Sequence, residues 1–172
     1  MTKKRKPESE MMSYGYDPHL SEGAAKTPLF QTSTFIFKNS EEGKAHFHIA
    51  YGLRKKRKNE SVSLAYSRIN NPNAEIVEER LKIWDNAEAC AVFQSGMAAI
   101  TTTILEITKP NTLIMHSSPL YGGTDHFMKH ILPKYGIHSM YFDSFDTIDK
   151  IINKKNKKYP NLEVSLVYIE SP

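Results

Sequence analysis

The fold is decided by residues 89–100, which read ACAVFQSGMAAI. Ala89 to Phe93 is a short apolar run typical of a buried strand, and Gly96 opens a longer stretch with helical spacing. A strand that passes through a tight turn into a helix is the first half of a βαβ unit. The stretch therefore predicts the α/β class, with a largely parallel sheet.

The same alternation of short apolar runs and helical segments continues to the end of the chain. We expect four strands, at Ala89–Phe93, Thr112–His116, His138–Phe142 and Glu163–Ile169. We expect the helices between them at Gly96–Ile107, Thr124–Leu132 and Phe145–Asn153. Because the last strand reads as a central one and the chain stops just after it, at Pro172, we expect this chain to be a fragment.

The part of the chain before residue 89 has a different pattern. A helix is expected at Pro72–Asp85, because Asn71 suits the N-cap and proline is tolerated in a first turn. One face of this helix is apolar and is expected to pack in the core; it carries Ile76, Val77, Leu81 and Trp84. Ahead of the helix we expect an extended arm at Pro28–Phe37, a short helix at Glu41–Tyr51 and a basic loop at Gly52–Ser63.

Composition indicates an ordinary soluble protein. The 172 residues are 40% hydrophobic and 24% charged, and no apolar run approaches the roughly 20 residues that span a bilayer. No apolar signal core follows the basic N-terminus, so we expect a cytoplasmic protein. The single cysteine, Cys90, lies in an apolar run, which favours a buried structural thiol over a nucleophile or metal ligand.

The net charge of +4 comes largely from three basic clusters, at Lys3–Lys6, Arg54–Lys58 and Lys154–Lys158. Such clusters can bind nucleic acid or an anionic surface. No aromatic residues interleave them, as base stacking would require, which favours a disordered tail and two solvated loops. We expect neither a nucleic acid nor a membrane as partner.

The turn at Ser95-Gly96-Met97 is suited to binding a phosphate. It leads into the start of a helix, where unpaired N–H groups and the positive end of the helix dipole attract anions. Gly96 allows close approach of the backbone, and Ser95 adds a hydroxyl. An ordinary strand-to-helix turn is the alternative.

Two further segments carry side chains of matching chemistry. Tyr66 and Arg68 are two residues apart in what we expect to be extended chain, so both side chains would point the same way and could clamp a phosphate. Tyr121 precedes Gly122 and Gly123 in a loop after an expected strand, where its ring could lie on a flat cofactor. The alternatives are a surface arginine beside a packed tyrosine, and a helix-capping turn with Tyr121 buried.

Together these segments resemble the Cys/Met-metabolism family of pyridoxal-phosphate (PLP) enzymes. The resemblance rests on Tyr-Ser-Arg-x-x-Asn-Pro at residues 66–72, Ser-Gly-Met-Ala-Ala at 95–99 and Leu-Tyr-Gly-Gly-Thr at 120–124. It extends from about Gly23 to Pro172. It implies a PLP-transferase fold of type I, with a tail, arm and basic loop at residues 1–65 and a truncated cofactor-binding domain at 66–172.

The resemblance also implies roles for the site residues. Ser95, Gly96 and Met97 would surround the phosphate of pyridoxal 5'-phosphate. Tyr66 and Arg68 would reach the phosphate of a neighbouring subunit, so that a homotetramer, a dimer of dimers, shares its active sites. Tyr121 would stack on the cofactor ring and assist proton transfer, and Glu170 would lie near the cofactor edge.

The resemblance places the cofactor-binding lysine and the aspartate beside the ring nitrogen beyond Pro172, so we expect residues 1–172 alone to be inactive.

Methionine γ-lyases of this family carry a cysteine where this chain has Gly123, which favours γ-replacement on an activated homoserine over γ-elimination. Asn73 also departs from the family, where threonine is frequent. A non-catalytic relative or a basic binding module remains an alternative, whereas a nucleotide-binding P-loop motif is missing from the sequence.

Overall fold

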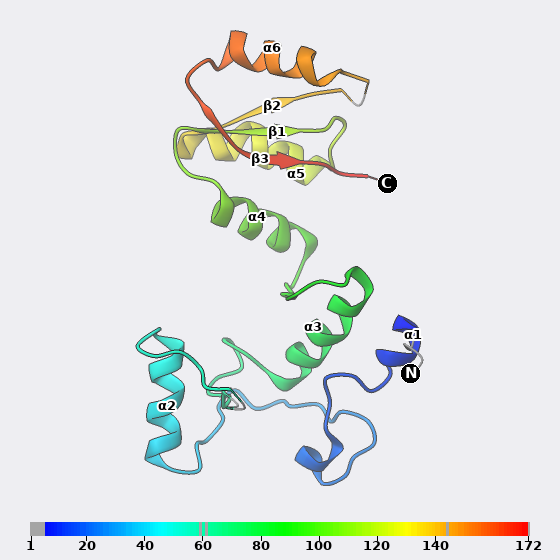
Figure 1. The fold of residues 1–172 in the computed structure, drawn as a ribbon, viewed down its shortest axis with the longest axis vertical. Helices are drawn as coiled ribbons and strands as arrows, with labels where there is room; N and C mark the ends of the chain where they lie inside the picture. The colour runs from blue at the N-terminus through cyan, green and yellow to red at the C-terminus, as the bar shows by residue number, and fades with distance from the viewer. Residues whose placement is uncertain (1–5, 59, 61, 144, 172) are drawn as a thin grey trace. The chain divides into compact units, whose positions relative to one another are not determined.

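The computed structural model describes residues 6–58, 60, 62–143 and 145–171. The chain divides into two compact units, Met1–Val92 and Phe93–Pro172 (Figure 1). The boundary that we expect between residues 65 and 66 falls inside the first unit, because α3 (Pro72–Asp85) packs there against α1 (Pro7–Glu10). Where the cofactor-binding domain starts stays a prediction.

The second unit is an α/β structure, as the alternation predicts. Its sheet has the strand order β2-β1-β3, and both pairings are parallel. In chain order the elements are α4 (Gly96–Ile107), β1 (Thr112–His116), α5 (Gly122–His126), a π-helical turn η2 (Phe127–Ile131), a 3-10 turn η3 (Leu132–Tyr135), β2 (Ile137–Tyr141), α6 (Ile148–Lys158) and β3 (Glu163–Tyr168).

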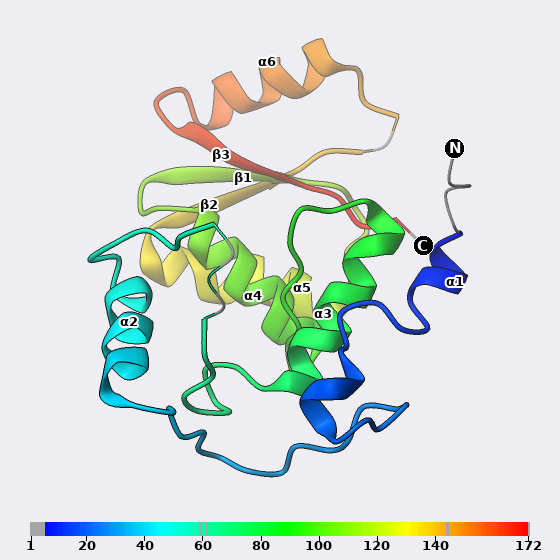
Figure 2. The ribbon, with the colours of Figure 1, turned by 60° about the horizontal axis from the view of Figure 1, so that its bottom comes forward.

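Helices cover both faces of this sheet. Figures 1 and 2 show α6 on one face and α4 with α5 on the other. The core lies on the α4 side, where Ile104, Ile114 and Met128 are almost fully buried. Each such side chain stabilises the fold by about 1.5–3 kcal/mol relative to an exposed one. This packing fixes the start of α4 relative to the sheet.

Two sequence-based expectations in this region are wrong. Ala89–Phe93 forms no strand, because a strand needs a hydrogen-bonded neighbour and no described segment pairs with it; the Val92 N–H donates instead to the Glu78 carboxylate at 3.0 Å. The cluster Lys154–Lys158 is the end of α6 rather than a loop, and cations there interact favourably with the helix dipole.

The first unit joins an extended arm to α3. Thr34 forms an isolated antiparallel bridge with Tyr66, and the expected arm at Pro28–Phe37 contains no helix. Asn73 ties it to the helix: its Oδ1 accepts from the Phe30 N–H and its Nδ2 donates to the Pro28 carbonyl, each at 2.8 Å. The asparagine that departs from the family pattern therefore anchors the arm.

The other elements of this unit are short. They are α1, the 3-10 turn η1 (Pro18–Ser21) and α2 (Ser40–Ala50). The tail cluster at Lys3–Lys6 lies almost wholly outside the described residues. Among the described residues, no helix is both long enough and apolar enough to cross a membrane.

The apolar face of α3 is less covered than its pattern predicts. Ile76 is buried, whereas Val77, Leu81 and Trp84 are 44%, 46% and 50% exposed. Ile76 is covered because the segment around Gly15 passes over it. Helical spacing identified the face but not which of its residues the chain covers.

Candidate functional site

The start of α4 has the features of an anion site. Ser95 is the N-cap, with an extended backbone, and its Oγ accepts from the Ala98 N–H at 3.1 Å. The first N–H groups of a helix have no acceptor within it, so those of Gly96 and Met97 remain available to a ligand. A Cβ atom built on Gly96 would meet nothing within 4 Å, so there is open space at this turn.

Tyr121 and Met97 come together at Gly123. A Cβ atom on Gly123 would lie 2.7 Å from Met97 Sδ and 2.9 Å from Tyr121 Cε1. Tyr121 directly precedes α5, and its side chain is 65% exposed. The structure thus brings an accessible aromatic ring beside the first turn of α4, and it corrects the alternative of a buried Tyr121.

Glu170, just after β3, binds the loop that carries Tyr121. Its Oε2 accepts from the Tyr121 N–H at 2.5 Å, and its Oε1 accepts from the hydroxyls of Thr124 and Tyr168, each at 2.9 Å. The Glu170 N–H in turn donates to Ser117 Oγ at 3.1 Å. The carboxylate therefore links the end of β3 to the start of α5, and the backbone of the same residue adds a link to the end of β1.

The electrostatics of Glu170 and Tyr168 follow from this arrangement. Partial burial raises the pKa of Glu170, but hydrogen bonds from Tyr121, Tyr168 and Thr124 outweigh it and hold that pKa below its usual value. For Tyr168, burial and the hydrogen bond to the Glu170 carboxylate both raise the pKa. At neutral pH Glu170 is therefore an ionised acceptor and Tyr168 a neutral donor.

Tyr66 and Arg68 lie in the first unit, and their backbone differs from the expected extended chain. The N–H groups of Ile69 and Asn70 donate to the Tyr66 carbonyl at 2.9 and 3.0 Å, so the segment is a turn. The Arg68 guanidinium nevertheless lies over the Tyr66 ring, 5.5 Å from its centroid, and both side chains are exposed. The turn therefore keeps together the pair that the spacing suggested.

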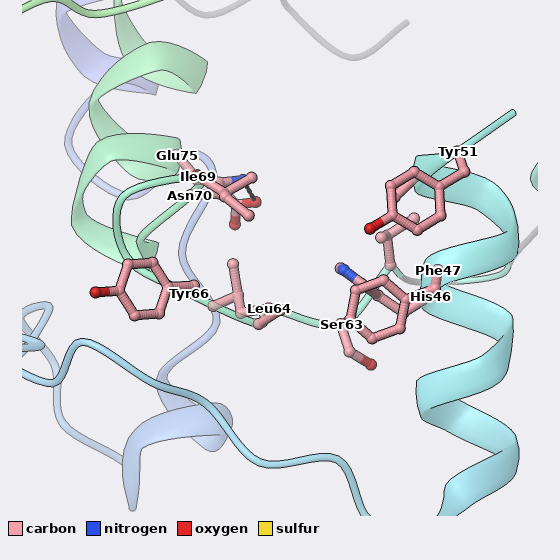
Figure 3. Close-up of a pocket in the computed structure, with 12 residues that line it drawn as sticks. His46, Phe47, Tyr51, Ser63, Leu64, Tyr66, Ile69, Asn70 and Glu75 are labelled. Carbon is pink, nitrogen blue, oxygen red and sulfur yellow. Dashed lines mark hydrogen bonds between the residues drawn. The ribbon is translucent and has the colours of Figure 1, made fainter.

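A pocket of about 270 Å³ in the same unit has Tyr66 in its wall (Figure 3). The aromatic side chains of Phe47, in α2, and Tyr51, directly after it, stand opposite Asn70 and Glu75. Burial raises the pKa of Glu75 although Asn70 donates a hydrogen bond to its carboxylate. No sequence pattern indicates this pocket, since its walls come from segments that only folding brings together.

Comparison with a family model supplies the decisive observation. Residues 8–172 match the model described as Cys/Met metabolism PLP-dependent enzyme. The chain belongs to the Cys/Met metabolism PLP-dependent enzyme family. The recognition from residues 66–72, 95–99 and 120–124 is confirmed, and with it the PLP dependence of the family.

The curated relatives that the chain matches include lyases and sulfhydrylases. The L-methionine gamma-lyase of Treponema denticola is 34% identical over 150 residues, which cover 87% of this chain and 33% of the relative. The O-acetyl-L-homoserine sulfhydrylase of Leptospira meyeri is 27% identical over 161 residues, which cover 92% and 34%. The chain thus spans about a third of the length of these relatives.

Solved structures of family members confirm the fold. A putative O-acetylhomoserine (thiol)-lyase of Campylobacter jejuni matches with a TM-score of 0.73 and 22% identity, over 87% of this chain and 34% of that one. That protein contains a pyridoxyl-lysine phosphate. MetB of Corynebacterium glutamicum matches with a TM-score of 0.68 and 20% identity, over 96% and 36%. The expected type I fold is confirmed.

The residues of the second unit suit the family's cofactor. The start of α4 offers backbone donors and open space, and Tyr121 offers an exposed ring beside it. Sequence reasoning gave Glu170 a place near the cofactor and missed Thr124 and Tyr168 as its partners. The separations of 46 and 49 residues from Glu170 to Thr124 and Tyr121 explain this, because no local pattern joins such positions.

Proposed function

We propose that this chain forms part of a PLP-dependent enzyme that carries out γ-replacement on an activated homoserine, forming a carbon–sulfur bond. The supporting observation is the meeting of Tyr121 with Met97 at the open first turn of α4. Family membership supports the cofactor. Substrate and reaction type are our inference from the site.

Each site residue has a proposed task. The N–H groups of Gly96 and Met97 donate to the cofactor phosphate, and the Ser95 hydroxyl, which already caps α4, lies beside them. Tyr66 and Arg68 bind the phosphate of a neighbouring subunit, and Arg68 supplies a planar set of donors for it. Tyr121 covers the cofactor ring and moves a proton to or from the substrate.

The bound cofactor supplies an electron sink that stabilises negative charge on the substrate carbons. The protein must then orient the substrate and hold Tyr121 where its phenol oxygen can exchange a proton. An exposed ring fixed through its own backbone, as Tyr121 is by Glu170, suits this task.

Gly123 favours replacement as the reaction. A side chain at this position would begin less than 3 Å from both Met97 and Tyr121. The cysteine that the family resemblance assigns to methionine γ-lyases would therefore push against the residues that we place at the cofactor. A chain with glycine here keeps Tyr121 close to α4 without that contact.

γ-Elimination is the second candidate. It is favoured by the identity of 34% to the L-methionine gamma-lyase of Treponema denticola and of 33% to that of Pseudomonas putida. The two reactions differ in whether a thiol enters after the leaving group departs. An assay with and without thiol therefore separates them.

We further propose a cytoplasmic homotetramer, arranged as a dimer of dimers with shared active sites. Its support is the pair Tyr66 and Arg68, two exposed residues whose proposed ligand belongs to another subunit. We propose too that residues 1–172 alone do not catalyse, since the resemblance assigns the cofactor-binding lysine to a segment outside them.

The test uses the full-length protein titrated with PLP, followed by visible absorbance and by dialysis. We expect Arg68→Ala to weaken PLP binding roughly tenfold, as for loss of a charge-assisted phosphate contact. Arg57→Ala, in the basic loop, is the matched control and should bind as the wild type does. Equal affinity in the two variants would remove Arg68 from the site.

The reaction is tested with O-acyl-homoserine plus cysteine, sulfide or no thiol. We expect a new thioether or thiol product with a sulfur donor and little α-ketobutyrate without one. Rapid release of α-ketobutyrate in the absence of thiol would establish the lyase alternative instead.

A further inference from the structure

We propose that Glu170 is a positioning residue, which holds the loop of Tyr121 in the place where its phenol acts. The inference rests on the proposed function of Tyr121. Glu170 lies 49 residues from Tyr121 in sequence, yet it binds the backbone rather than the ring of that residue. The ring stays 65% exposed while its own N–H group is held.

The contacts of Glu170 leave it little capacity for a second task. Its two oxygens accept three hydrogen bonds, one from the Tyr121 backbone and two from hydroxyls. A carboxylate bound in this way is turned toward protein groups. We therefore place its action on the loop rather than on the cofactor.

Thr124 makes the carboxylate difficult to replace. Its side chain has 0% exposure, and its hydroxyl donates to Glu170 Oε1. Removing the acceptor would leave a buried hydroxyl without that partner, which is costly. Since Thr124 and Tyr121 flank the same two glycines, loss of Glu170 would loosen both ends of the short loop.

Between these two ends the loop is held by packing at Gly123. Gly123 lies against Met97 and so joins the loop to the first turn of α4. Glu170 joins the same loop to the end of β3. Opening of the loop would carry Tyr121 away from Met97. The consequence is a lower rate of the step in which Tyr121 moves a proton, with the phosphate site at α4 left in place.

The first experiment measures amide hydrogen exchange of the apoprotein, so it does not depend on cofactor chemistry. Glu170→Ala should speed exchange at Tyr121 roughly tenfold or more, the effect of losing hydrogen bonds to a charged acceptor. Glu163→Ala, an exposed position at the start of β3, the strand that precedes Glu170, is the matched control and should leave Tyr121 unchanged. Unchanged exchange at Tyr121 in Glu170→Ala overturns the inference.

Glu170→Gln is the conservative variant and covers the case that Glu170→Ala does not fold. A glutamine can accept from the Tyr121 N–H with its oxygen and donate to the two hydroxyls with its amide. We expect it to restore slow exchange and most of the activity. Exchange at Tyr121 as fast in Glu170→Gln as in an unfolded segment would count against positioning through hydrogen bonds.

The second experiment uses the holoenzyme. Measured at saturating PLP, so that the cofactor stays bound, Glu170→Ala should lower kcat roughly tenfold, because Tyr121 acts in proton transfer while the phosphate donors of α4 stay in place. Loss of PLP together with activity would contradict this separation. Failure of the wild type to bind PLP would overturn the proposed function, whereas the exchange result would still decide whether Glu170 holds the loop.

Discussion

Replacing Gly123 with alanine tests whether Tyr121 and Met97 are held together as the structure shows. The added Cβ would lie 2.7 Å from Met97 Sδ and 2.9 Å from Tyr121 Cε1, both well short of the 3.4 Å at which ordinary contact begins. Something must therefore move. The exposed Tyr121 ring has less packing to lose than the half-buried Met97, so we expect the ring to give way.

Gly122→Ala is the matched control for this substitution. It makes the same chemical change one residue earlier in α5, where the new Cβ would meet nothing within 4 Å. Both alanines gain about 0.5–1 kcal/mol from the reduced flexibility of the helix start. Overpacking costs about 1–3 kcal/mol and applies to Gly123→Ala alone. Because a mobile ring absorbs part of the strain, we expect a difference near 1 kcal/mol.

Urea unfolding of the two variants measures this difference, and PLP titration measures its effect on the site. We expect Gly123→Ala to be the less stable variant and to bind PLP several-fold more weakly, while Gly122→Ala matches or exceeds wild-type stability. Equal stability and equal affinity in both variants would show that Gly123 is not packed against Met97 and Tyr121, and γ-replacement would then lose its structural support.

Two further predictions concern stability. In α4, Ile104→Ala should cost about 2–5 kcal/mol of unfolding free energy, because Ile104 is only 1% exposed. Ile107→Ala is the control and should cost far less, because Ile107 is 47% exposed. Similar losses in the two variants would contradict the core as described. The Glu170 carboxylate has a pKa below its usual value of 4.5, so its charge should contribute its full stabilisation of the fold at pH values above 4.5. This contribution should be lost as the pH falls through the lowered pKa. Unfolding of the wild type and Glu170→Gln followed from pH 7 downward checks this, and a stability difference that stays constant into acid would refute it.

Several elements could be predicted from the sequence because their signals lie within a few residues. Asn71 and Pro72 marked the start of α3, and Gly96 opened the stretch of helical spacing that forms α4 with the bounds that the structure has. The short apolar run at Thr112–His116 identified β1. The family motifs likewise depend on short stretches, so the cofactor class followed from residues alone.

The turn that holds Tyr66 and Arg68 shows where such local reasoning fails. Alternation in an extended chain and a tight turn both place these side chains near each other, and only backbone hydrogen bonds to the Tyr66 carbonyl distinguish the two. Ala89–Phe93 fails for a related reason. Its composition suits a strand, but strand formation depends on a neighbour that the sequence does not reveal.

The start of α4 is thus a property of the sequence by itself, since capping, glycine spacing and helix dipole all act within one turn. The setting of Tyr121 belongs to the tertiary structure. It depends on Glu170, 49 residues away, and on Met97 lying against Gly123. Parallel strands bring their carboxyl ends to one edge of a sheet regardless of separation along the chain, and that geometry creates contacts that no local pattern encodes.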